Sequence, residues 1–189
     1  MRLRFLILIV SFFMAATPAK AEILATFYSH DFSATYFPHA FIRVQGTIEE
    51  TGEEIDTNYG FTAKSTSPGI LFGSVKHMME TKKIGYVNKS DAHFTLRLDD
   101  TGYAKLMALV EEWANIEGKG YNLKKRNCVH FAMEMAALFD LDVNRKSKFF
   151  KKPKSFMKEL MELNPELALI LPDQTPAEEP VQIASKPVE

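Results

Sequence analysis

Two kinds of hydrophobic periodicity divide the central part of the chain. Before residue 99, apolar, aromatic and β-branched residues form short runs separated by turn residues, a pattern typical of strands. The strands expected from this pattern span residues 23–28, 39–48, 55–63 and 92–98. The second run ends at the acidic turn Glu49 to Glu54, and the last run alternates apolar and polar residues. Short strands joined by turns predict an antiparallel sheet.

The period then changes to that of a helix. The sequence Asp99-Asp100-Thr101 is a helix-capping signal, and apolar residues follow it at helical spacing from Tyr103 to Ala114. Gly118 provides a stop signal for this helix. We therefore expect an amphipathic helix directly after the last predicted strand.

Two more helices follow in the pattern. One begins at Asn127, a favourable N-cap residue, and carries an apolar stripe from Cys128 to Phe139. The other starts at Pro153 or Ser155. Together these elements predict an α+β domain in which helices pack against an antiparallel sheet.

The first 21 residues have the three parts of a secretory signal peptide. Arg2 and Arg4 precede an apolar run from Phe5 to Ala16, and a small-residue cleavage site ends at Ala21. The apolar run has about a dozen residues, whereas a spanning helix needs about 20. Cleavage after Ala21 is therefore favoured over a retained anchor. The mature protein is expected to be periplasmic or secreted, without a stable membrane anchor.

The remaining chain is expected to form one domain over residues 22–171, followed by a disordered tail, rich in Pro and Glu, over residues 172–189. Without residues 1–21 the chain has 20 basic and 24 acidic side chains. This balance argues against a nucleic-acid-binding protein. The basic segment 145–154 is expected to be a solvated linker rather than a membrane or cell-wall contact. Nothing in the sequence indicates an oligomeric state.

Cys128 is the only cysteine in the chain, so it has no disulfide partner there. A free thiol in an oxidising compartment is open to unwanted oxidation, which suggests that this cysteine has a function. The first turn of a helix lowers the pKa of a thiol through its unpaired backbone N–H groups. The alternative is a structural role, because Cys128 also belongs to an apolar stripe and free cysteines are often buried as small hydrophobic residues.

A nucleophilic thiol needs a base within hydrogen-bonding reach, and the five histidines are the candidates. His39 is preferred, because it starts a predicted strand from which an imidazole can face a neighbouring element. His130 follows Cys128 by two residues, so on a helix it points about 200° away from the thiol. Its expected role is structural, toward Glu134.

The other three histidines are weaker candidates. His30 lies in a sequence expected to be a polar loop, from which it could line a cleft. His77 and His93 have no acidic or cysteine neighbours at metal-ligand spacing. No metal site and no cofactor is predicted.

At three segments the chain resembles the circularly permuted papain-like hydrolases, a group that includes NlpC-type amidases and peptidases and the relatives of lecithin retinol acyltransferase. The segments are Tyr121-Asn122-Leu123, Asn127-Cys128-Val129-His130-Phe131 and Pro38-His39-Ala40-Phe41-Ile42. In that group a histidine on an early strand precedes a catalytic cysteine that heads a helix. The resemblance covers about residues 36–141 and implies a single permuted papain-like (NlpC-type) domain.

The resemblance also implies roles for individual residues. Cys128 matches the catalytic nucleophile and His39 matches the base. A polar residue that orients the base usually comes from the next strand, where Asn58 is preferred and Thr57 and Tyr59 are its alternatives.

The acyltransferase branch of the group is a poorer match. Its members tend to have a second histidine on the next strand and a glutamate after the cysteine. This chain has no histidine between His39 and His77, and Val129 follows the cysteine.

The function expected from these features is that of an exported thiol hydrolase, a cysteine peptidase or amidase that cleaves an amide bond through an acyl-thioester intermediate. Its expected substrate is a peptide or peptidoglycan-like molecule of the cell wall. One alternative is a lipid ester or thioester hydrolase, or an acyltransferase, that uses the same residues. The other is a non-catalytic binding domain of the same fold.

Overall fold

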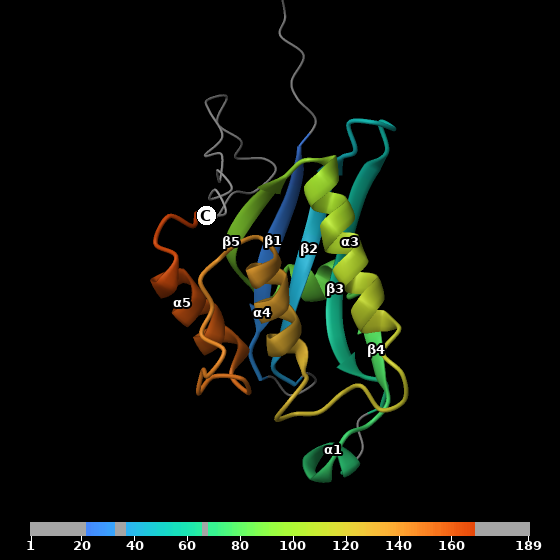
Figure 1. Ribbon diagram of the computed structural model, residues 1–189, viewed down its shortest axis with the longest axis vertical. Helices are drawn as coiled ribbons and strands as arrows, with labels where there is room; N and C mark the ends of the chain where they lie inside the picture. Colours follow the sequence, from blue (N-terminus) through green and yellow to red (C-terminus); the bar gives the residue numbers. More distant parts are fainter. Residues whose placement is uncertain (1–21, 33–36, 66–67, 169–189) are drawn as a thin grey trace, which may run out of the picture.

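The computed structural model describes residues 22–32, 37–65 and 68–168 (Figure 1). The predicted signal peptide and the predicted tail at residues 172–189 both lie outside these ranges. The folded part combines one sheet with helices and is an α+β structure, as the hydrophobic pattern predicts.

Five antiparallel strands form the sheet, in the order β4-β3-β2-β1-β5. They are β1 (Ile23–His30), β2 (His39–Thr47), β3 (Glu54–Ala63), β4 (His77–Glu80) and β5 (Asp91–Leu98). The four predicted strands are confirmed. The pattern did not predict β4, because this strand has only four residues, His-Met-Met-Glu, without an alternation of apolar and polar positions.

Three longer helices cover one face of this sheet (Figure 1). They are α3 (Asp100–Ala114), α4 (Cys128–Leu138) and α5 (Pro153–Leu163), so the third predicted helix begins at the first of its two candidate positions. The predicted cap of α3 is also present, since Oδ1 of Asp99 accepts a 2.7 Å hydrogen bond from the N–H of Gly102. Two single-turn helices, α1 (Gly69–Phe72) and α2 (Ile84–Val87), were not predicted. Among the described residues, none of the helices has both the length and the apolar character needed to cross a bilayer.

The two faces of the sheet bury different clusters. The main core lies under α3, α4 and α5 and includes Ala40 and Ile42 of β2. A smaller cluster on the other face joins Phe41 of β2 to Tyr86 and Val87 of α2. Since side chains alternate along a strand, His39 lies on the same face as Phe41, and the two rings stack with centroids 6.1 Å apart.

The end of β1 corrects one expectation. Ser29 and His30 belong to the strand rather than to a polar loop, and His30 is buried. The oxygen Oγ of Ser29 lies 2.7 Å from Nε2 of His93, and Nδ1 of His30 lies 3.1 Å from Oγ of Ser90. The His30 ring also stacks on Tyr86. These partners, distant in sequence, allow polar side chains to be buried in a strand.

The main core gives a first prediction. Phe131 of α4 is fully buried, and its ring centroid lies 5.4 Å from that of Trp113 on α3. We expect Phe131→Ala to lower the free energy of unfolding by about 3–5 kcal/mol, because it leaves a cavity between helices and sheet. Urea denaturation measures this loss. The control Leu163→Ala, at a side chain that is 42% exposed, should change the value by about 0.5 kcal/mol or less. Equal losses for the two variants would contradict the assigned core.

Candidate active site

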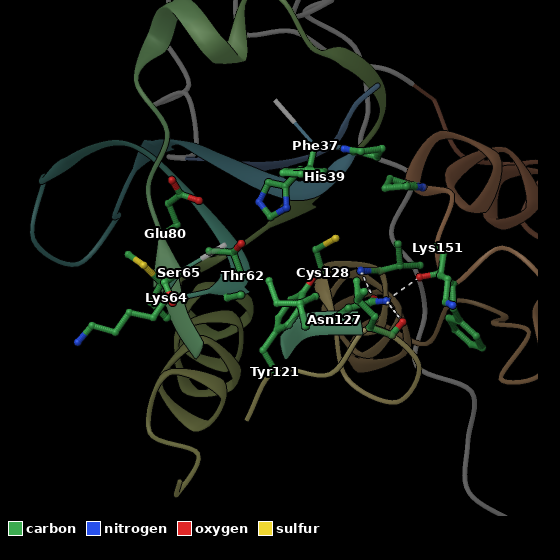
Figure 2. Close-up of a pocket in the computed structure, with 18 of the residues that line it drawn as sticks. Phe37, His39, Thr62, Lys64, Ser65, Glu80, Tyr121, Asn127, Cys128 and Lys151 are labelled. Carbon is green, nitrogen blue, oxygen red and sulfur yellow. Dashed lines mark hydrogen bonds between the residues drawn. The ribbon is translucent and has the colours of Figure 1, made fainter. Parts of the chain in front are cut away.

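The side chain of Asn127 fixes the start of α4. Its Oδ1 accepts hydrogen bonds from the backbone N–H groups of Val129 (2.9 Å) and His130 (3.2 Å). Its Nδ2 donates to the carbonyl oxygens of Leu123 (2.9 Å) and Phe150 (2.7 Å) (Figure 2). One buried amide therefore ties the first turn of the helix to the chain before it and to the segment leading into α5.

Cys128 follows this cap as the first residue of α4 and is 5% exposed. Burial raises the pKa of the thiol to about 11, while hydrogen bonds from the backbone N–H groups of Ala40, Val129 and Cys128 itself act in the opposite direction. The helix start does lower the pKa as expected, but desolvation outweighs it. The thiol is therefore protonated at neutral pH and needs a base to become a nucleophile. Its contact with Ala40 places the sulfur beside the start of β2.

His39, the first residue of β2, is 7% exposed. Burial lowers its pKa to about 3, and the charges of Lys82 and His30 add to this shift. The imidazole is therefore neutral at neutral pH. Its Nε2 is buried and has no hydrogen-bond partner within the described part of the chain.

Cys128 and His39 line the same cavity, which has a volume of about 760 Å³ and lies at the end of the sheet where β2 begins and β3 ends (Figure 2). The thiol reaches it from the face covered by α4, and the imidazole from the face covered by α2. No hydrogen bond joins the sulfur to an imidazole among the residues that the structure describes. Other residues of the cavity wall include Thr62, Lys64, Glu80, Lys82, Tyr121 and Phe150.

Asn58 is buried on β3 and does not line the cavity. Its Oδ1 accepts a 2.7 Å hydrogen bond from the N–H of Lys82, and its Nδ2 donates a 2.8 Å bond to the carbonyl oxygen of the same residue. The structure therefore places Asn58 against the backbone of Lys82, and its role in orienting His39 stays a prediction. Of its two alternatives, Tyr59 packs against the main core on the other face.

Three residues of the site were missed by sequence reasoning. Gly60 of β3 lies directly under the imidazole, because a Cβ at this position would overlap Nε2 of His39. A glycine inside a strand often marks such a close approach, so this signal was present. Glu80 and Lys82 lie at the end of β4 and just after it. No signal identified them, because β4 itself was not predicted.

His130 has a structural environment. Its ring stacks on Phe150 with centroids 4.2 Å apart, and its Nδ1 lies 2.9 Å from Oδ1 of Asn127. Burial lowers the pKa of His130 and the charge of its expected neighbour Glu134 raises it, while Glu134 also forms a 2.6 Å ion pair with Arg145. The ring therefore supports the capped start of α4 from outside the cavity that holds Cys128 and His39.

In the described ranges, no three His, Cys, Asp or Glu side chains are grouped so that they could hold a metal ion. His77 lies at the start of β4, and His93 lies within β5.

No protein-family model matches this chain, and no curated protein or solved structure matches it either.

The burial of His39 predicts a pH effect on stability. Its pKa is lowered from 6.5 to about 3 on folding, so below pH 6.5 the unfolded chain binds more protons than the folded one. The stabilising contribution is complete above pH 6.5 and is lost as the pH falls toward 3. We expect His39→Gln to flatten the decline of the free energy of unfolding across this range, measured by urea denaturation at several pH values. Thr62→Val, which removes no titratable group, should keep the wild-type slope. A wild-type slope in His39→Gln would show that His39 is not buried in its neutral form.

Proposed function

We propose that this protein is an exported cysteine hydrolase with a permuted papain-like fold, and that Cys128 attacks the carbonyl carbon of an amide. The observation that supports this proposal is the presence of a helix-heading thiol and a buried imidazole in the wall of one cavity. Nucleophilic catalysis by a thiol needs a base near it, and these two groups line the same cavity. Because the predicted signal peptide implies export, cell-wall peptide is the proposed substrate.

In the proposed reaction, His39 accepts the proton of the Cys128 thiol as the sulfur forms a bond to the carbonyl carbon. The carbonyl oxygen becomes an oxyanion near the start of α4, where backbone N–H groups favour negative charge. The C–N bond then breaks, and the protonated His39 returns its proton to the leaving amine. A water molecule, deprotonated by His39, hydrolyses the acyl thioester and regenerates the thiol.

The resting state of this pair is uncharged. Burial raises the pKa of Cys128 to about 11 and lowers that of His39 to about 3, so an ion pair of thiolate and imidazolium is disfavoured before substrate arrives. Proton transfer therefore accompanies the attack of sulfur on the substrate. Stabilisation of the imidazolium during that step becomes a requirement of the site.

A lipid ester or thioester is the second candidate substrate, and the mouth of the cavity favours it. Phe37 and Leu71 line the cavity, yet their side chains are 68% and 69% exposed. Large apolar side chains in such positions suit an acyl chain, and exposed apolar patches often mark binding surfaces. Lys64 and Lys151 also line the cavity and are available to a negatively charged head group.

Substitutions at the two proposed catalytic residues test the hydrolase. We expect Cys128→Ala to abolish hydrolysis and His39→Gln to reduce its rate by about 10²- to 10⁴-fold, the usual contribution of general acid–base catalysis. Product release from peptidoglycan fragments and from phospholipids, assayed side by side, measures the rate and separates the two substrate classes. His77→Gln, outside the cavity, should keep wild-type activity. Full activity in Cys128→Ala would reject Cys128 as the nucleophile for both substrate classes, whereas no hydrolysis of either substrate by the wild type would favour a binding domain of the same fold.

Thiol labelling provides a test that needs no substrate. We expect iodoacetamide to modify Cys128 in the native protein, at a rate that rises with pH because the thiol pKa is raised. Mass spectrometry after timed labelling measures this rate. Modification that occurs only after unfolding in urea would mean that Cys128 is an inert core residue.

A further inference from the structure

The imidazole of His39 has one nitrogen that the site described so far leaves without a partner. Nε2 belongs to a side chain that is 7% exposed, and it has no hydrogen bond within the described residues. A buried polar atom without a partner costs free energy and calls for an explanation. In a thiol–imidazole mechanism the second ring nitrogen normally donates to a group that holds the ring in position and stabilises its positive charge.

Building on the proposed function, we propose that Glu80 is the positioning residue of His39, and that its carboxylate, which pairs with Lys82 in the structure, moves to accept a hydrogen bond from Nε2–H beside Gly60.

The absence of a side chain at Gly60 lets the side chains of His39 and Glu80 approach each other. A Cβ at position 60 would overlap Nε2 of His39, so the ring fills the space above this glycine. Gly60 and Glu80 are paired residues of β3 and β4. Paired residues on one face of an antiparallel sheet have Cβ atoms about 4.5–5.5 Å apart. The Cβ atom of Glu80 therefore lies about one cross-strand spacing from Nε2 of His39. A glutamate side chain can span this distance.

The charge distribution of the cavity also favours Glu80 as the residue that positions His39. It is the only acidic residue among the described residues that line the cavity. Its Oε1 forms a 2.7 Å ion pair with Nζ of Lys82, and the two side chains are 29% and 19% exposed. A carboxylate has a second oxygen that can accept another hydrogen bond. Figure 2 shows the His39 ring between Glu80 and Cys128 in projection.

The charged and titratable groups around His39 explain why an acceptor is needed. Lys82 and His30 both act against a positive charge on the ring. Asn58, the residue expected to orient the base, has both ends of its amide bound to the backbone of Lys82. Because Nε2 faces Gly60, Nδ1 is left to accept the proton from the sulfur of Cys128. The carboxylate then balances the imidazolium charge without itself taking up the proton.

The test compares Glu80→Gln, which keeps the shape and removes the charge, with Glu80→Asp, which keeps the charge. The readouts are the pH titration of the His39 ring, followed by ¹⁵N-edited NMR, and the pH profile of Cys128 labelling by iodoacetamide. We expect Glu80→Gln to move the His39 midpoint to lower pH and to slow labelling at neutral pH by roughly tenfold, a typical coupling between residues in one network. Glu80→Asp should restore the His39 midpoint and the labelling rate in part. Glu54→Gln, at an exposed position of β3, is the matched control and should match the wild type.

A double-mutant cycle with Lys82 distinguishes a direct effect of Glu80 on His39 from an effect that acts through Lys82. We expect Lys82→Gln to speed labelling, because it removes a positive charge near His39, and Glu80→Gln to slow it, although both variants break the same ion pair. We also expect Glu80→Gln to slow labelling again in the Lys82→Gln background. No effect of Glu80→Gln in that background would overturn the proposal, because Glu80 would then act only through Lys82.

The outcomes for the two proposals are distinct. The NMR midpoint of His39 does not depend on catalysis, so a wild-type midpoint in Glu80→Gln overturns the role of Glu80 even if Cys128 and His39 are essential for hydrolysis. Conversely, a shifted midpoint supports the contact with Glu80 even if Cys128→Ala retains activity and Cys128 is rejected as the nucleophile.

Discussion

The buried amide of Asn127 determines how the site is assembled. Four of its hydrogen bonds satisfy two N–H groups at the start of α4 and two carbonyl oxygens in segments before and after that helix. Helix ends leave such groups unpaired, and a buried helix start without partners would be costly. With the first turn fixed in this way, Cys128 is held against the backbone of Ala40 at the beginning of β2. The position of the thiol follows from a cap that is 2% exposed, rather than from a mobile loop.

Desolvation is the second constraint on the site, and it acts on both proposed catalytic groups. It keeps the thiol of Cys128 protonated and the imidazole of His39 neutral. A neutral pair is stable at rest, whereas the charged pair needed in the reaction is costly in such an environment. The polar groups nearest His39 therefore decide whether the site is catalytic. For this reason three features matter as much as the thiol itself: Nε2, which has no partner among the described residues, its close approach to Gly60, and the ion pair between Glu80 and Lys82.

Elements with a strong local signal could be predicted from the sequence, and elements that depend on distant residues could not. The strands predicted at residues 39–48 and 55–63 and the helix predicted to start at Asn127 correspond to β2, β3 and α4, because each has a long periodic signal or a specific capping residue. The strand β4 was missed because four residues carry no period. His30 was assigned to a loop because its polar neighbours suggested one, while its partners Ser90 and Tyr86 lie more than fifty residues away.

The sequence by itself determined the class of the fold and the N-cap of α4 at Asn127, and it led to Cys128 and His39 as the proposed catalytic groups. These features depend on local preferences, on hydrophobic period and on the count of one cysteine, all of which can be read along the chain. The tertiary structure decided that both groups line one cavity, that burial outweighs the effect of the helix start on the thiol, and that Gly60 lies against the imidazole with Glu80 as its cross-strand partner. Strand register and desolvation depend on residues that are distant in sequence, so no local pattern contains them.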